Sequence, residues 1–173
     1  METTINDSGS GLLAGITRVF PEADIQLDTF HSLNSLGKEI TKIERKTYAM
    51  ISEENELTKR AEGKRPKEKT IKKLEQIEPK VKEAIRNYDI LHILFCWIRE
   101  LLSFSGYCLD DTISLIEFAL YEIENIAGDV YPALLKQTKA FRKNIPLLLS
   151  YITRLKGAMD KSCRVSTQRR IIY

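Results

Sequence analysis

Residues 28–57 decide the fold of this chain, and they read DTFHSLNSLGKEITKIERKTYAMISEENEL. Apolar side chains recur in this stretch with a helical period, and charged side chains fill the positions between them. That spacing is typical of an amphipathic α-helix, which buries one apolar stripe against a neighbour. The stripe consists of Phe30, Leu33, Ile40, Ile43, Thr47, Met50 and Leu57. The stretch therefore predicts one long helix that packs by one face.

A second long helix is predicted directly after the first. Gly63 and Pro66 interrupt the helical pattern, because glycine and proline are poorly tolerated inside a helix. The pattern resumes over residues 67–104, where the first half is basic and the second half is apolar. Pro79 lies inside this range and is expected to kink or divide the helix.

Two further helices follow along the chain. Asp110 or Asp111 is expected to cap the third helix, which ends before Gly128. The fourth helix follows Asp129, and Pro146 is expected to bend it. The pattern then fades, so the sequence predicts a bundle of three or four helices with a frayed tail.

The N-terminal segment, residues 1–28, has a different character. Thr-Thr-Ile-Asn suits a strand, a glycine-rich turn follows it, residues 12–20 have helical spacing, and residues 23–27 alternate like a strand. Strand, helix and strand in this order predict a βαβ unit with a parallel pairing. Two short strands do not make a stable sheet alone. We therefore expect exposed strand edges at Ile5, Ile25 and Leu27, and marginal stability.

Two motifs in this region resemble a family of DNA transposases. The first begins Asp7-Ser-Gly-Ser-Gly-Leu and continues with Phe20-Pro-Glu-Ala, and the second is Gln26-Leu-Asp-Thr-Phe-His. In this order they resemble the second-aspartate region of Mutator-like and related bacterial transposases of the DDE, RNase H-like kind. That pattern has an Asp after a strand, a glycine-rich turn, Phe-Pro-x-Ala, and a Cys/Asp-x-x-His signature that opens a helical insertion. The match covers residues 5–38.

The resemblance implies a fold class and a division of the chain. The expected fold is mainly α, with a small βαβ piece of an RNase H-like core followed by an insertion of three or four helices. The core piece is expected over residues 1–28, the helical insertion over 29–156, and a frayed or aberrant tail over 157–173.

Asp7 is the candidate catalytic and metal-binding residue. DNA strand cleavage and transfer need two divalent ions, and Mg²⁺ prefers carboxylate oxygens. A carboxylate just after a parallel strand lies where open α/β sheets bind their ligands. By resemblance, Asp7 is the second of three metal-binding carboxylates in the intact relative. The alternative is that Asp7 only caps the next helix or forms a turn.

Asp28 and His31 match the Asp-x-x-His signature. They stand three residues apart at a helix start, so they share a face. The resemblance implies a supporting role near the active site, next to metal or DNA. The alternative, which is compatible with it, is that Asp28 caps the helix and His31 benefits from its charge.

A basic run lies between the first two long helices. It is expected to contact DNA, because such a run neutralises phosphates without reading sequence. The alternative is a solvated loop and helix face. The expected DNA-binding residues are Lys64, Arg65, Lys67, Lys69, Lys72 and Lys73.

Several other residues are expected to be structural. His92 and Trp97 lie in an apolar stretch, where core packing is the expected role. Cys96, Cys108 and Cys163 are odd in number and lack a CxxC spacing, so buried free thiols are expected rather than a disulfide or zinc framework.

The function expected from this resemblance is that of a transposase fragment. The family's first metal-binding Asp has no match in this sequence. No Glu follows Met159, in the region where the family has its catalytic Glu. The chain is therefore expected to be truncated and inactive alone, with Mg²⁺ as the cofactor of the intact relative. The alternative is a non-enzymatic helical module that binds a protein or nucleic acid. A third option is a truncated chain that regulates a full-length transposase. Expected partners are DNA and either a second copy or a full-length transposase. No apolar run spans a bilayer, so no membrane is expected and the expected location is the cytoplasm.

Overall fold

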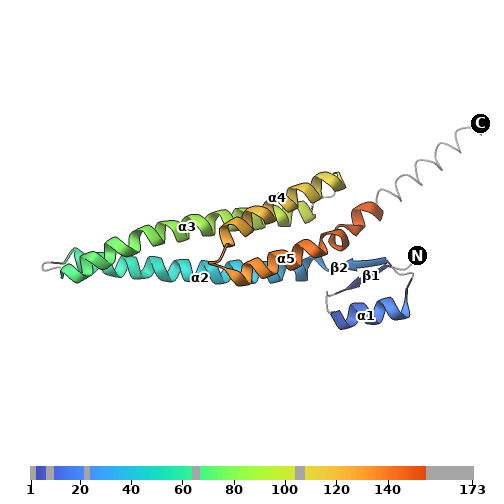
Figure 1. Ribbon diagram of the computed structural model, residues 1–173, viewed down its shortest axis with the longest axis horizontal. Helices are drawn as coiled ribbons and strands as arrows, with labels where there is room; N and C mark the ends of the chain where they lie inside the picture. Colours follow the sequence, from blue (N-terminus) through green and yellow to red (C-terminus); the bar gives the residue numbers. More distant parts are fainter. Residues whose placement is uncertain (1–2, 7–9, 22–23, 64–66, 104–107, 155–173) are drawn as a thin grey trace, which may run out of the picture.

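The computed structural model of this 173-residue chain describes residues 3–6, 10–21, 24–63, 67–103 and 108–154. Helices dominate this part of the chain (Figure 1). The elements in order are β1 (Thr3–Asn6), α1 (Ser10–Val19), β2 (Asp24–Leu27), α2 (Thr29–Ala61), α3 (Glu68–Ser103), α4 (Leu109–Ala127) and α5 (Pro132–Leu148).

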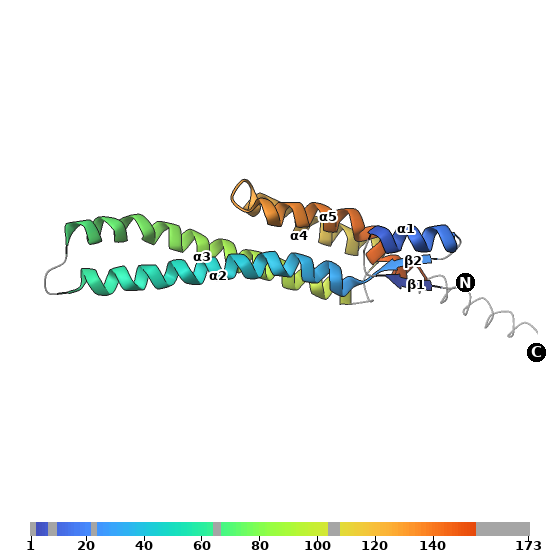
Figure 2. The ribbon, with the colours of Figure 1, turned by 90° about the horizontal axis from the view of Figure 1, so that it is seen from below.

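The four long helices form a bundle with a projecting arm. Helix α2 packs against α3 and α5, and α4 packs against α3 and α5, so the four helices close a ring. Helices α4 and α5 cover only the half of the α2–α3 pair near the strands, and the other half extends beyond them (Figures 1 and 2). We call this projecting half the two-helix arm.

The core lies inside the ring of four helices. Each helix contributes fully buried aliphatic side chains, which interdigitate where the four apolar stripes meet; they include Leu36, Leu91, Ile98, Ile116, Leu120, Ile123, Leu134 and Leu148. Buried Thr47, Thr112 and Thr138 each donate a hydrogen bond to the carbonyl four residues earlier. Their hydroxyls therefore enter the core without an unsatisfied donor.

Helix ends agree only in part with the capping residues expected. Asp28 caps α2, and Gly128 ends α4 with a φ of 39°, a backbone conformation that suits glycine. The N-cap of α4 is Cys108, which makes no side-chain capping bond, so the prediction of Asp110 or Asp111 as the cap is wrong. Both aspartates lie in the first turn, where their charge favours the helix dipole.

Both prolines lie inside continuous helices. Helix α3 continues through Pro79 without being divided, and α5 contains Pro146 and ends two residues later at Leu148.

The predicted strand, helix and parallel strand are present, but the fold-class prediction that this βαβ unit is a piece of an RNase H-like core is wrong. The described N-terminal residues form one short parallel pair, β1 with β2 from Thr3 opposite Asp24 to Asn6 opposite Leu27. Two four-residue strands and one ten-residue helix do not amount to a piece of such a core, which is built on an extended sheet. The strand pair instead sits at the end of the bundle, where β2 contacts α5.

Some expectations fall on residues outside the described part. The tail over 157–173 and the side chains of Ile5, Ile25 and Leu27 are among them. Among the described helices, none has both the length and the hydropathy required to cross a bilayer.

Candidate nucleic-acid interface

Asp28 and His31 meet at the start of α2. One carboxylate oxygen of Asp28 accepts a hydrogen bond from the backbone N–H of Phe30 at 2.8 Å, and the other lies 2.6 Å from Nδ1 of His31. The first contact caps the helix, because it satisfies a backbone donor that lacks a partner within the helix. The second contact orients the imidazole ring. The capping role of Asp28 is confirmed, and the supporting role in a transposase site stays a prediction.

The same contacts change the acidity of Asp28. The hydrogen bond from His31 lowers the pKa of the Asp28 carboxyl below its usual 3.8. Burial opposes this effect, and the hydrogen bond from the backbone N–H of Phe30 adds to it. The carboxylate is therefore ionised in neutral solution, where it can hold the cap and the imidazole together.

Asp7, the candidate catalytic and metal-binding residue, lies outside the described residues. The described residues contain no cluster of three His, Cys, Asp or Glu side chains placed to hold a metal ion. The magnesium role of Asp7 therefore stays a prediction.

The end of the two-helix arm is basic. We call this surface the basic tip, and it comprises Lys59, Arg60, Lys67, Lys69, Lys72 and Lys73, all of them exposed. Lys64 and Arg65 belong to the same run in the sequence and lie outside the described residues. The tip thus brings the end of α2 and the beginning of α3 together, far from the four-helix ring (Figure 1).

Few carboxylates neutralise the basic tip. Arg60 pairs with Glu56 at 2.9 Å and Lys72 pairs with Glu68 at 2.7 Å, and both pairs are open to solvent. Exposed pairs of this kind contribute little free energy, so their cations can exchange partners. No carboxylate of the described part pairs with the remaining four cations, Lys59, Lys67, Lys69 and Lys73. The basic tip can therefore approach a polyanion at low cost.

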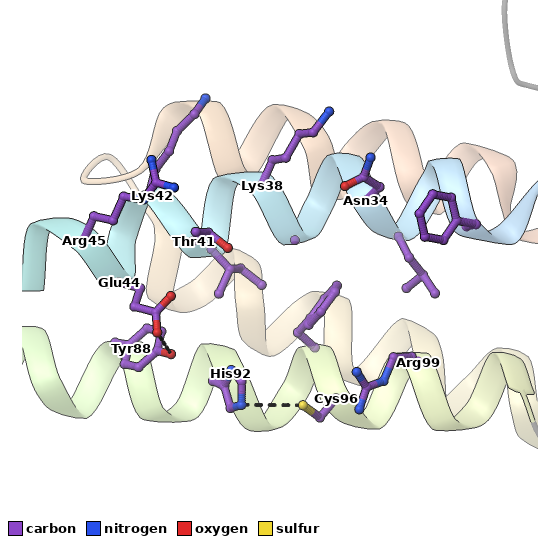
Figure 3. A pocket seen from close by; sticks show the side chains of 15 residues that line it. Asn34, Lys38, Thr41, Lys42, Glu44, Arg45, Tyr88, His92, Cys96 and Arg99 are labelled. Carbon is purple, nitrogen blue, oxygen red and sulfur yellow. Dashed lines mark hydrogen bonds between the residues drawn. The ribbon is translucent and has the colours of Figure 1, made fainter.

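A groove runs along the outer side of the α2–α3 pair, within the half that forms the ring. Its volume is about 590 Å³, and we call it the outer groove. Helix α2 lines it between Phe30 and Arg45, and α3 lines it between Tyr88 and Arg99 (Figure 3). This site was not predicted from the sequence. Lys38, Lys42 and Arg45, spaced one helical turn apart on one face of α2, were the signal that could have indicated it.

His92 belongs to the outer groove and not to the core. The side chain is exposed, stacks at a tilt on Tyr88 with 5.8 Å between ring centroids, and lies 3.7 Å from Sγ of Cys96. The core prediction for His92 is wrong, because its position on α3 faces away from α4 and α5. Cys96 is half-buried and Cys108 is exposed; both are free thiols, while Cys163 lies outside the described residues.

A hydrogen bond between α2 and α3 closes one end of the groove. The Tyr88 hydroxyl donates to Oε1 of Glu44 at 2.8 Å, as the dashed line in Figure 3 shows. Burial of the phenol, together with this bond to a carboxylate, raises the pKa of Tyr88 to about 12.

An apolar patch lies on another face of the bundle. Trp97 of α3 is half-buried and meets Phe118 of α4 edge to face, with ring centroids 6.2 Å apart. Ile93, one turn before Trp97, and Tyr121, one turn after Phe118, are more than half exposed. The core prediction for Trp97 is thus only partly correct, since its ring covers the core and also forms part of an exposed surface.

Comparison of the chain with protein-family models, with curated proteins and with solved structures gave no match.

Proposed function

We propose that this chain is a fragment of a DNA transposase that acts in the cytoplasm and binds DNA through the basic tip. It has no strand-cleaving activity alone in this proposal, because its sequence matches only one of the family's three carboxylates, Asp7. In the intact relative, Asp7 would bind Mg²⁺ together with the two carboxylates that have no match here.

The observation that carries the proposal is the basic tip itself. Six exposed cations gather at the end of an arm, and two of them form only weak pairs with Glu56 and Glu68. An arm that presents cations away from the main body can reach a duplex without a clash between the duplex and the bundle. Binding to phosphates releases counterions and supplies the free energy of such contacts.

The contact between Asp28 and His31 supports the link to transposases. These are the two residues of the Asp-x-x-His signature, and they touch at the start of a long helix, where the family's helical insertion begins. Capping alone requires Asp28 and does not require a histidine at position 31.

DNA binding by the purified chain across a salt series tests the proposal. The probe is a labelled mixed-sequence duplex, and the variant changes Lys69, Lys72 and Lys73 to Glu. We expect the logarithm of the affinity to fall linearly with that of the salt concentration, with a slope of about −0.9 per phosphate neutralised. The triple variant should bind more weakly and with a shallower slope, by about 1 for each phosphate that it no longer neutralises.

A matched control variant distinguishes the loss of phosphate contacts at the basic tip from the effect of a changed net charge. Lys136, Lys139 and Lys143 are three exposed lysines on α5, and their change to Glu alters the net charge by the same amount. Loss of binding in the tip variant alone supports the proposal, and equal losses in both variants contradict it. If the folded wild-type chain binds no duplex, the non-enzymatic interaction module becomes the better function, and the exposed patch of Ile93, Trp97, Phe118 and Tyr121 is the observation that favours it.

A further inference from the structure

One residue of α2 that lines the outer groove, Gly37, has no side chain. A Cβ atom on Gly37 would lie 3.0 Å from the tip of the Phe95 ring. The tip of the Phe95 ring therefore lies directly against Gly37, and the ring forms part of the floor of the groove. The lining follows α2 from Phe30 to Arg45, which is a length of several helical turns. The groove thus extends along several turns of both helices.

Aromatic rings are available along this groove. Phe30 stands at the end nearest the strands, and it is 70% exposed although it is large and apolar. Phe95 forms the floor, and Tyr88 with His92 lies toward the other end. The rings of Phe30 and His92 are exposed, and those of Phe95 and Tyr88 are half-buried. Aromatic rings that solvent reaches are surfaces on which unpaired bases stack. Polar groups stand among them, namely Asn34, Thr41, His92 and Cys96.

The charge of the groove is strongly positive. Lys38, Lys42 and Arg45 line the α2 side of the groove, where the amino groups of Lys38 and Lys42 point away from α3, and Arg99 lines the α3 side (Figure 3). Glu44 is the one carboxylate in the described lining, and it already accepts the hydrogen bond of Tyr88. Nζ of Lys42 forms an ion pair with Oε1 of Glu39 at 2.6 Å. Lys38, Arg45 and Arg99 are therefore the cations most available to a ligand.

We propose that the outer groove binds single-stranded nucleic acid, with phosphates along the edge formed by Lys38 and Arg45 and bases stacked on Phe30 and Phe95. This site is separate from the basic tip and does not depend on duplex binding there. Paired bases are stacked inside a duplex and leave no face for an aromatic side chain, so the rings favour an unpaired strand. An amphipathic peptide helix is disfavoured, because Thr41, His92 and Cys96 interrupt the apolar floor that its buried face requires.

Fluorescence anisotropy with a labelled thymidine oligonucleotide tests the proposal on the full chain. Phe30→Ala should weaken single-strand binding roughly five- to a hundredfold, the range found when a stacking ring is removed. Lys38→Glu together with Arg45→Glu should weaken it at least as much and reduce its salt dependence. All three side chains are exposed, and circular dichroism should therefore show an unchanged fold.

Two controls and two competitors make the result decisive. Lys136→Glu with Lys139→Glu on α5 matches the charge change and should leave single-strand binding intact. The tip variant at Lys69, Lys72 and Lys73 should weaken duplex binding without an equal loss of single-strand binding. Equal loss of single-strand and duplex binding on changing Lys38 and Arg45 would overturn the proposal. So would equally tight binding of polyglutamate or of thymidine monophosphate, or no binding of the oligonucleotide by the wild-type chain.

Discussion

At the scale of single residues, Asp28 has two contacts that can be separated by substitution. Asn at an N-cap keeps the hydrogen bond to Phe30 N–H but loses the charge, whereas Ala loses both. Asp28→Ala should lower the free energy of unfolding by about 1 kcal/mol, and Asp28→Asn by a few tenths. Urea denaturation near neutral pH measures the difference. Equal losses in the two variants would show that the charge pair with His31, and not the cap, is the stabilising contact.

The depressed pKa of Asp28 also sets the sign of its pH dependence. Since the pKa is lower in the folded chain than the usual 3.8, the carboxylate contributes stability above about pH 4, and this contribution is lost as the pH falls through the folded pKa. The gap between wild type and Asp28→Ala should therefore close on acidification. A gap that widens toward acid would contradict this linkage.

The stability that Tyr88 contributes has the opposite pH dependence. Its pKa of about 12 exceeds the ordinary 10.0, because burial and the hydrogen bond to Glu44 both disfavour the phenolate. The stabilisation is complete below pH 10, where the phenol is protonated in both states, and is lost as the pH rises toward 12. The ultraviolet titration curve of the wild type, after subtraction of the curve of Tyr88→Phe, should show one phenol ionising near pH 12. Glu44→Gln should lower the pKa of this phenol. A difference curve centred near pH 10 would contradict the contact.

At the scale of helices, Arg142 joins α5 to α4. Its Nε lies 2.6 Å from Glu117, and one terminal nitrogen lies 2.8 and 2.9 Å from the two oxygens of Glu124. Burial opposes the charge of Arg142, but the hydrogen bonds to both carboxylates outweigh it and raise the pKa of the guanidinium. The two glutamates stand two helical turns apart on α4, so a single arginine of α5 bridges two turns of α4.

Arg142→Met keeps the apolar stem and removes the charge. A third of the Arg142 side chain is exposed, so its ion pairs are partly screened by solvent. We expect the free energy of unfolding to fall by about 1 kcal/mol, the upper end for pairs that water reaches. Thermal or urea unfolding measures this loss.

The matched control for Arg142 is Arg60→Met, which breaks the exposed pair with Glu56. Because solvent surrounds both partners of that pair, its removal should change the unfolding midpoint much less than Arg142→Met does. Equal effects of the two substitutions would show that Arg142 makes no more than a surface contact.

Also at this scale, the positions of the helices were predicted far better than the faces that each helix buries. The breaks near Gly63 and after Ser103, the cap at Asp28 and the end at Gly128 follow from local backbone preferences that the sequence displays directly. The faces of α3 are harder to assign, and the prediction of a core position for His92 is wrong. An apolar run on one helix does not reveal which of its faces α4 and α5 will cover, because that depends on the partners.

At the scale of the whole molecule, the basic tip was predicted from composition and the outer groove was not. The tip is formed by residues close in the sequence, so charge counting finds it. The groove joins residues from the first turn of α2 to those near the end of α3, and its floor depends on Gly37 and Phe95 meeting. The RNase H-like core piece was predicted by resemblance alone, and the described strands are too few and too short to form it.

The sequence by itself determined the long helices, the cap at Asp28, the end at Gly128 and the charge of the arm, because periodicity, capping and charge are local properties of the chain. Only the tertiary structure decided which faces were covered and where the outer groove opened. It also decided that Arg142 bridges two helices and that Tyr88 meets Glu44. These features depend on the packing of segments far apart in the sequence, where side-chain volume and the closeness of two backbones select the partners.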